Sequence, residues 1–337
     1  MRIPFWQLSK IYSFGCLIKN SLYAAKILKP IKAPIKVISI GNLSFGGTGK
    51  TPTSIEVIKF LQNKNKKVCF VTRGYKSKWE RRGGILSDGK KIMGTWQESG
   101  DEAFLAAQNL PGAGIFIGRN RYKSCLNAAQ MGFEIAVLDD AFQHRKLFRD
   151  IDIVLLSEDR DGFFREFPSS LKRADILLMK KNALFSPPLS SLIKKGAPRI
   201  PIHKYTIFPQ GIFPAGKSLP PADADFFKDK KTLAFCGIAK PERFFSLLNE
   251  LGIEPVQRII YPDHHPFPNS SIKKILETAL REKFSAIITT EKDAVKIEQT
   301  VLPKEHSVYY LKIRMDIQEE FYQRLWSKLE NIPDKKP

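Results

Sequence analysis

Residues 35–40 read IKVISI and residues 44–51 read SFGGTGKT, with GNL between them at 41–43. The first run is short, apolar and β-branched, which predicts a buried strand. Residues 51–61 predict a helix, because Pro52 falls in the first turn, where no amide hydrogen is needed. A glycine-rich loop between a strand and a helix is an arrangement that binds phosphate.

Residues 44–51 match the pattern G-x-x-x-x-G-K-[ST] at every position but the first, which is Ser44. Three glycines let the backbone curl so that its amide groups point at phosphate oxygens. The lysine can reach the β- and γ-phosphates, and the threonine hydroxyl can bind Mg²⁺. The sequence therefore predicts a nucleoside triphosphate site made of Ser44, Phe45, Gly46, Gly47, Thr48, Gly49, Lys50 and Thr51, with Thr51 also a metal ligand.

Strand and helix patterns alternate on the carboxyl side of this loop. Further strands are predicted at residues 68–72, 115–117, 133–138, 151–156 and 176–179, with helices at 102–110 and 122–130. This alternation predicts an α/β fold, a P-loop NTPase-like and mostly parallel sheet with helices on both faces. Residues 76–100, which contain Gly83, Gly84, Gly89 and Gly94, predict a loop or hairpin.

Residues 186–225 are rich in proline and serine and are interpreted as a linker. A second, smaller α/β unit is expected beyond it, with strands at 232–236, 256–261, 286–289 and 308–311 and a closing helix at 321–329. The predicted organisation is an N-terminal amphipathic helix over 1–34, a P-loop core domain over 35–200 and a smaller α/β domain over 201–330.

The pair Asp139-Asp140 ends the apolar run at 135–138. A P-loop enzyme places the carboxylate that holds Mg²⁺ at such a strand end. Adjacent strand residues point to opposite faces, so both carboxylates can reach one metal ion only if the strand has already ended. Which of the two binds the metal is left open.

Composition sets the class of protein and of its partners. The 337 residues suggest about two domains, and 43% hydrophobic with 26% charged residues is typical of a globular protein and excludes a disordered tail or bare coiled coil. The net charge is +21, and residues 1–70 hold twelve Lys and Arg against one acid. Such an excess favours anionic partners: phosphates, nucleic acid or an acidic membrane surface. The four cysteines lack any zinc-like spacing.

The segment 5–28 combines aromatic and aliphatic residues with Lys10, Lys19 and Lys26. This pattern is typical of a helix lying on a membrane surface, and equally of a helix packed on the core with lysines at its rim. The lysines interrupt the apolar run well before the roughly 20 residues that a membrane span needs.

Three polar clusters are candidates for the chemistry of a phosphate acceptor, which needs a group to take or orient a proton. They are Gly100-Asp101-Glu102, Gln143-His144-Arg145 and Asp263-His264-His265. Arginines at predicted strand ends or in loops are candidate phosphate clamps. These arginines are Arg73, Arg119, Arg121 and Arg165.

Eight segments, in order, together resemble the family of tetraacyldisaccharide 4′-kinases of lipid A synthesis. They are VISIGNLSFGGTGKTP, TRGY at 72–75, GDE at 100–102, VLDDAFQHRKLFRD at 137–150, FREFPSSLKRAD at 164–175, CGIAKPERF at 236–244, DHHPF at 263–267 and TTEKDAVK at 289–296. The chain departs from the family pattern at Lys76, Ala103 and Ala141, which bears on loop shape and acyl-chain preference.

The resemblance implies transfer of the γ-phosphoryl group of ATP to the 4′-hydroxyl of tetraacyldisaccharide 1-phosphate, giving lipid IVA. It implies a peripheral or monotopic enzyme on the anionic cytoplasmic face of the inner membrane, with the smaller domain closing over the active site. It implies neither nucleic acid nor an obligate protein partner.

Site residues carried over from the resemblance fall into three groups. Asp101 matches the catalytic carboxylate and His264 the histidine that pairs with it, alongside Lys50. Asp139 and Asp140 match the metal-binding acids. The expected substrate contacts are Arg73, Tyr75, Glu102, Arg119, Gln143, His144, Arg165 and Glu166.

Two other functions use the same phosphate loop. A membrane-associated nucleotide switch would dimerise or leave the membrane with nucleotide, and a nucleic-acid-stimulated NTPase would use the basic charge on a phosphate backbone. The switch gives the GDE and DHH motifs no role, and the sequence contains no recognisable nucleic-acid-binding module.

Overall fold

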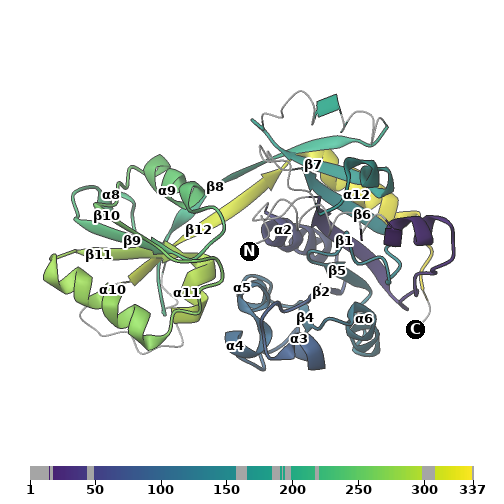
Figure 1. Cartoon of the computed structure of the whole chain (residues 1–337), viewed down its shortest axis with the longest axis horizontal. Coiled ribbons are helices and arrows are strands. Elements are labelled where there is room, and N and C mark those ends of the chain that lie inside the picture. Colours follow the sequence, from purple (N-terminus) through teal and green to yellow (C-terminus); the bar gives the residue numbers. More distant parts are fainter. Residues whose placement is uncertain are drawn as a thin grey trace, which may run out of the picture. The chain divides into compact units, whose positions relative to one another are not determined.

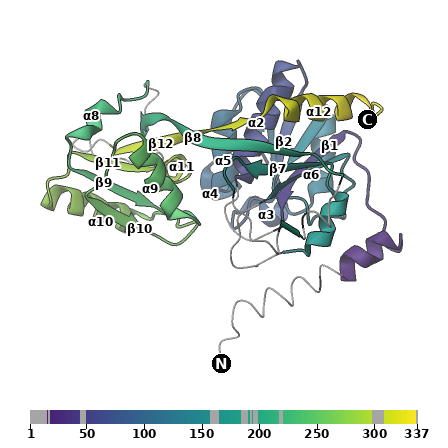
Figure 2. The ribbon, with the colours of Figure 1, turned by 90° about the horizontal axis from the view of Figure 1, so that it is seen from above.

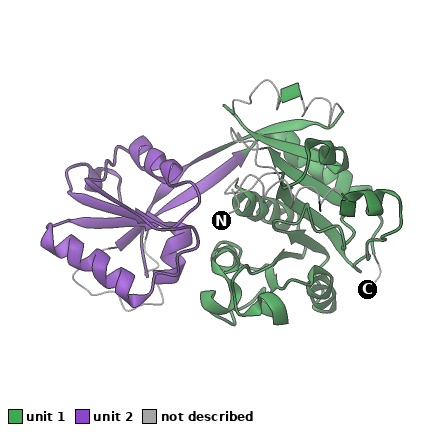
Figure 3. Cartoon of the chain, viewed as in Figure 1, with its two compact units in different colours: residues 1–206, 317–337 green, residues 207–316 purple. Residues whose placement is uncertain are grey.

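The computed structural model describes residues 15, 18–43, 49–156, 165–183, 190–191, 193, 199–216, 220–297 and 308–335. It consists of two compact units: Met1–Thr206 with Ile317–Pro337, and Ile207–Asp316 (Figure 3). The second unit is thus inserted into the first. The last helix, α12 (Glu319–Glu330), belongs to unit 1, whereas the sequence alone placed it in the second domain.

Unit 1 contains a mostly parallel sheet, as predicted. Its strand order is β8-β7-β6-β1-β5-β2-β4-β3. Only the pairing of β3 with β4 is antiparallel among the strand pairings described in this unit. The strands are β1 (Lys36–Asn42), β2 (Val68–Thr72), β3 (Gly84–Asp88), β4 (Gly114–Ile117), β5 (Ile135–Leu138), β6 (Ile151–Leu156), β7 (Ile176–Lys180) and β8 (Ile202–Pro214).

Helices cover both faces of this sheet. Figures 1 and 2 show α2 (Lys50–Asn63) and α6 (Arg121–Gln130) on opposite sides of β1 and β2. Cys125 and Ala128 of α6 pack in one core with Val37 and Val71. On the α2 side, the rings of Phe60 and Tyr322 lie 4.8 Å apart, so α2 and α12 are neighbours. The other helical segments are α3 (Trp79–Arg82), α4 (Trp96–Ser99), α5 (Asp101–Asn109) and the 3₁₀ helix η1 (Pro168–Arg173).

Two segments read as loop or linker contain regular structure. Residues 76–100 include α3, the edge strand β3 and α4. Residues 186–225 include the thirteen-residue strand β8. His203 and Tyr205 are buried between exposed neighbours, which is the period of a half-buried strand. Pro209 and Gly211 obscured that alternation, because both residues weaken a strand pattern.

Unit 2 contains the strand order β10-β9-β11-β12-β8. Strands β10, β9, β11 and β12 pair in parallel, and apolar cores cover both faces. Strands β8 and β12 extend across the boundaries between the units. The new elements are α8 (Asp225–Lys228), β9 (Thr232–Cys236), α9 (Pro241–Glu250), β10 (Gln257–Ile260), α10 (Asn269–Arg281), β11 (Ala286–Thr290), α11 (Glu291–Ile297) and β12 (Val308–Ile317).

The predicted N-terminal helix lies only partly within the described residues, because residues 1–14, 16 and 17 fall outside them. Residues 18–24 are helical, and Ile18 and Ile27 are 50% and 69% exposed. Over the described ranges, no helix has the length and hydropathy that a membrane span requires.

Candidate active site

Most of the predicted site residues of unit 1 lie in the loops that follow its parallel strands. The carboxyl ends of parallel strands meet at one edge of a sheet, which is where such folds bind ligands. Gly49, with φ at 90°, directly precedes α2, whose first two residues are Lys50 and Thr51. The predicted contacts of Ser44, Phe45, Gly46, Gly47 and Thr48 lie outside the described residues.

Asp139 is a buried carboxylate with two hydroxyl partners. It follows β5 and is 1% exposed. The hydroxyl of Thr51 donates to its Oδ2 at 2.9 Å, and that of Ser54 donates to its Oδ1 at 3.0 Å. Burial, followed by the negative charges of Glu102 and Asp140, raises the pKa of Asp139 to about 7. The Asp139 carboxyl therefore changes between its protonated and ionised forms near neutral pH.

Asp140 has the opposite electrostatic environment. Its backbone is left-handed, with φ at 48°, so the strand has ended and the two carboxylates need not alternate across the sheet. Arg165 donates from one nitrogen to both carboxylate oxygens at 2.8 Å, and Nζ of Lys50 lies 3.6 Å away. Burial raises the pKa of Asp140, but Lys50 and Arg165 outweigh it and hold the pKa below its usual value.

Arg121 adds a buried cation that the sequence named only as one of four candidate clamps. It begins α6 after the cap residue Asn120 and is 4% exposed. Its NH1 donates to the carbonyl of Gly118 at 3.3 Å, and within the described residues its Nε has no hydrogen-bond partner. Burial lowers the pKa of Arg121 to about 10, against the opposing charge of Asp140. The usable signal was the capped helix start directly after strand β4.

The TRGY and GDE motifs pack against each other. Gly74 has φ at 66°, and a Cβ there would lie 2.9 Å from the carbonyl oxygen of Ser99, so only glycine fits. Asp101 follows in the first turn of α5 and is 7% exposed. Its Oδ1 accepts from the backbone nitrogen of Glu102 at 3.0 Å. The glycine contact thus brings residues 73–75 beside the candidate catalytic carboxylate.

Several predicted substrate residues make contacts with groups other than the Asp139–Asp140 pair. Nε of Arg73 donates to the carboxylate of Glu80 at 2.6 Å. The backbone nitrogen of Arg119 donates to the backbone carbonyl of the same residue. Tyr75 is 50% exposed. Gln143 donates from Nε2 to the carbonyl of Asn42 at 2.8 Å, at the end of β1.

Two further predicted substrate residues of this unit are His144, which is half-buried, and Glu166, which is buried. Burial, followed by the charge of Arg121 and then of Lys19, lowers the pKa of His144 to about 3, so this ring is neutral. Glu166 is 2% exposed and pairs with Arg173.

His264 belongs to unit 2, and Asp101 belongs to unit 1. His264 has a left-handed backbone, with φ at 61°, in the loop after β10. Its Nε2 lies 3.5 Å from Nζ of Lys292 and 3.8 Å from a carboxylate oxygen of Asp263. Its pairing with Asp101 stays a prediction.

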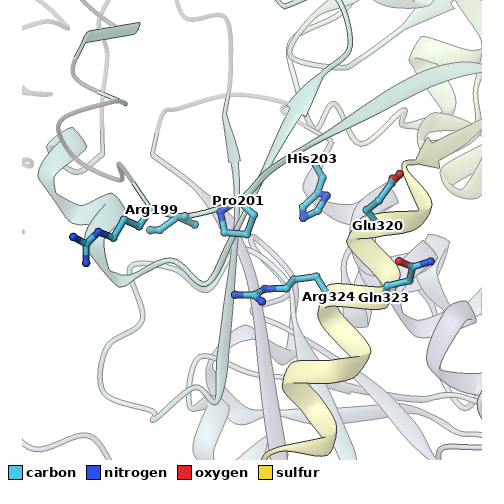
Figure 4. A pocket seen from close by; sticks show the side chains of 7 residues that line it. Arg199, Pro201, His203, Glu320, Gln323 and Arg324 are labelled. Atoms are coloured by element: carbon cyan, nitrogen blue, oxygen red, sulfur yellow. The ribbon is translucent and has the colours of Figure 1, made fainter.

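A pocket of about 570 Å³ lies elsewhere in unit 1, at the start of β8 and along α12. Because β8 is parallel to β7, this pocket lies at the amino edge of the sheet, opposite the carboxyl edge. None of its lining residues is a predicted site residue (Figure 4). They are Arg199, Ile200, Pro201, His203, Glu320, Gln323 and Arg324.

The donor set fits a hard divalent cation held together with a nucleotide. No group of three or more His, Cys, Asp and Glu side chains is arranged to hold a metal within the described ranges. Magnesium commonly takes one or two protein oxygens and completes its shell with phosphates and water. The hydroxyl of Thr51 beside the carboxylate of Asp139 offers that smaller set.

A helix that starts with Lys-Thr at the carboxyl edge of a parallel sheet, beside a buried acid, defines the class of P-loop nucleotide-dependent phosphotransferases. The model of the family described as tetraacyldisaccharide-1-P 4′-kinase (LpxK) matches residues 1–330. The chain belongs to this family and is a kinase, which confirms the resemblance noted in its motifs.

Individual relatives agree with this assignment. A tetraacyldisaccharide 4′-kinase of Syntrophus aciditrophicus is 34% identical over 331 residues, covering 90% of this chain and 88% of that protein. One from Desulfatibacillum aliphaticivorans is 34% identical, covering 86% and 82%. The crystal structure of LpxK from Aquifex aeolicus in complex with ATP is similar, with a TM-score of 0.74, 27% identity and coverage of 96% and 97%.

Proposed function

We propose that this chain transfers the γ-phosphoryl group of ATP to the 4′-hydroxyl of tetraacyldisaccharide 1-phosphate. The observation that carries the proposal is the contact of Thr51, at the start of α2, with the buried carboxylate of Asp139. Family membership supplies the acceptor, since the relatives are named for that reaction. Neither the switch nor the nucleic-acid function is favoured by these relatives.

Phosphoryl transfer is catalysed mainly by positioning and by neutralising charge on the moving group. We propose that Thr51 and Asp139 hold Mg²⁺, which when bound offsets charge on the phosphates. Lys50 then lies next to the γ-phosphate. Arg165 keeps Asp140 ionised and beside Lys50, which fixes the lysine in place. Arg121 supplies a second, buried positive charge.

The acceptor hydroxyl must be oriented and must lose its proton. We propose that Asp101 accepts or orients this proton and that His264 acts with it, as the family motifs imply. The position of Asp101 in the first turn of α5 supports the role, because the amide groups there stabilise a carboxylate. General-base catalysis typically contributes about 10²–10⁴-fold.

We propose further that the enzyme works on an anionic membrane surface, the cytoplasmic face of the inner membrane. The support is the charge of +21 and the exposed apolar residues Ile18, Ile27, Leu28 and Ile31. Basic residues near a surface add about 1 kcal/mol each on anionic lipid.

The test is transfer of label from γ-labelled ATP to tetraacyldisaccharide 1-phosphate in detergent micelles. Wild type is compared with Asp101→Ala and Lys50→Ala, and ATP affinity is measured for each. Asp101→Ala should lower turnover by about 10²–10⁴-fold with ATP affinity nearly unchanged. ATP hydrolysis without labelled lipid would contradict the proposed reaction. A collapse of ATP binding in Asp101→Ala would contradict the role of that residue.

A further inference from the structure

One side chain of the N-terminal segment contacts two loops of the candidate site. Asn20 lies half-buried in the helical stretch 18–24. Its Nδ2 donates to Oε1 of Glu166 at 3.1 Å. NH1 of Arg145 donates to the carbonyl of Asn20 at 2.9 Å and to its Oδ1 at 3.3 Å. Both functional atoms of the Asn20 amide are therefore used, each by a different loop.

Glu166 depends on its hydrogen-bond partners because it is only 2% exposed. Its second oxygen accepts from the guanidinium of Arg173, which also lies over the ring of Phe142. A buried carboxylate needs its hydrogen bonds, since each one that is lost leaves charge without compensation. Asn20 therefore supplies a bond that Glu166 cannot readily replace with water.

The backbone next to Glu166 is hydrogen-bonded to the residue that follows β1. The amides of Arg165 and Glu166 both point to the carbonyl of Leu43, at 2.5 and 3.4 Å. Leu43 follows β1 and directly precedes the predicted phosphate-binding residues. The side chain of Arg165 in turn holds both oxygens of Asp140. The position of Glu166 thus affects where Arg165 holds this acid.

Arg145 forms the second connection. Its guanidinium lies 4.8 Å from the ring centre of Tyr23, one helical turn after Asn20. Arg145 follows the Asp pair by five residues along the same loop. The helix therefore holds the loop after the acidic pair and the segment that carries Arg165 at the same time.

We propose that Asn20 is a positioning residue for phosphoryl transfer: it connects the N-terminal helix to the Arg165–Asp140 pair. The inference rests on the proposed roles of Arg165 and Asp140. It assigns the helix a part in the geometry of the site, apart from any part in membrane contact. Loss of Asn20 then leaves nucleotide binding intact but loosens the arginine that orders the acid.

The first experiment compares Asn20→Ala with Ser21→Ala in the full-length chain. Ser21 is the exposed neighbour on the same helix and serves as the matched control. With the micellar lipid assay, kcat of Asn20→Ala should fall roughly tenfold, since it loses a hydrogen bond to each of two charged groups. Ser21→Ala should stay within about twofold, and KM for ATP should change little in either variant.

The second experiment separates positioning from general stability. In an Arg165→Ala background, the guanidinium that holds both oxygens of Asp140 is absent, so adding Asn20→Ala should cost less than about twofold in kcat. A residue that only stabilised the fold would cost the same factor in both backgrounds. That result, or equal kcat for Asn20→Ala and Ser21→Ala, would overturn the inference.

A third variant pair tests the hydrogen bond itself. Asn20→Asp removes the donor and sets a second carboxylate against Glu166, so kcat should fall below that of Asn20→Ala. Adding Glu166→Gln reverses the hydrogen bond, because the amide of residue 166 can then donate to the carboxylate of residue 20. The double variant should therefore recover kcat several-fold over Asn20→Asp alone. No recovery contradicts the proposed bond. Wild type that binds ATP but labels no lipid contradicts instead the proposed function.

Discussion

The carboxyl ends of the parallel strands in each unit carry the same chemical pair, an aspartate and a lysine, in different surroundings. In unit 1, Nζ of Lys50 lies 3.6 Å from Asp140, and the Asp140 side chain is 35% exposed. In unit 2, Nζ of Lys296 lies 3.1 Å from Asp293, and the two side chains are 1% and 0% exposed. One pair can be reached by a ligand, and the other is sealed.

The bonds around the sealed pair explain its role. Asp293 also accepts from the amide of Gly237 and the hydroxyl of Thr290, and Lys296 also donates to the carbonyl of His265. These bonds join the ends of β9 and β11 to the histidine loop. A fully satisfied ion pair of this kind organises a fold. For the accessible pair in unit 1, we propose instead a role beside phosphate and metal.

The largest effect on stability is expected for Lys296→Met. The substitution leaves Asp293 ionised in the core without its counter-charge, which should lower the free energy of unfolding by about 3–5 kcal/mol. Urea unfolding followed by circular dichroism measures it. Adding Asp293→Asn removes the stranded charge and should restore part of the loss. A single variant as stable as wild type would show that the pair is not structural.

A pH-dependent effect is expected at the accessible edge. The pKa of Asp139, raised to about 7, exceeds that of an unfolded aspartate, so folding favours its protonated form. The stability it contributes is complete at acid pH and is lost as pH rises through 7. Asp139→Asn should therefore match wild type only near pH 4, about the pKa of an unfolded aspartate, gain on it as pH rises to 7 and exceed it at pH 8, in urea unfolding without nucleotide. A difference independent of pH would contradict the raised pKa.

The smallest effect is expected for an exposed pair in the same unit as Lys296. Nζ of Lys273 lies 3.8 Å from Glu277 on α10, and both side chains are more than half exposed. Lys273→Met should change the free energy of unfolding by no more than about 0.5 kcal/mol, because solvent screens the pair. A loss close to that of Lys296→Met would mean that burial does not govern the comparison.

Much of the fold could be predicted because strand and helix periods are local. The run at 35–40, the strand at 68–72 and the Asp pair at a strand end were all found from pattern alone, and β2 has the predicted bounds. Strand β8 was missed because Pro209 and Gly211 resemble a linker, whereas its two-residue alternation depends on which face is covered. Helix α12 belongs to unit 1. This depends on packing between residues far apart in the sequence, which a local pattern cannot predict.

The sequence by itself determined the class of chemistry and the candidate residues for it, because motif spacing places Lys50, Thr51 and Asp139 at predictable strand and helix ends. Only the tertiary structure decided the pKa values of the acidic residues among them. Asp139 and Asp140 are chemically identical neighbours, yet burial raises the pKa of one, while Lys50 and Arg165 hold down that of the other. Such differences arise from charges far apart in sequence, which meet only when the sheet has formed.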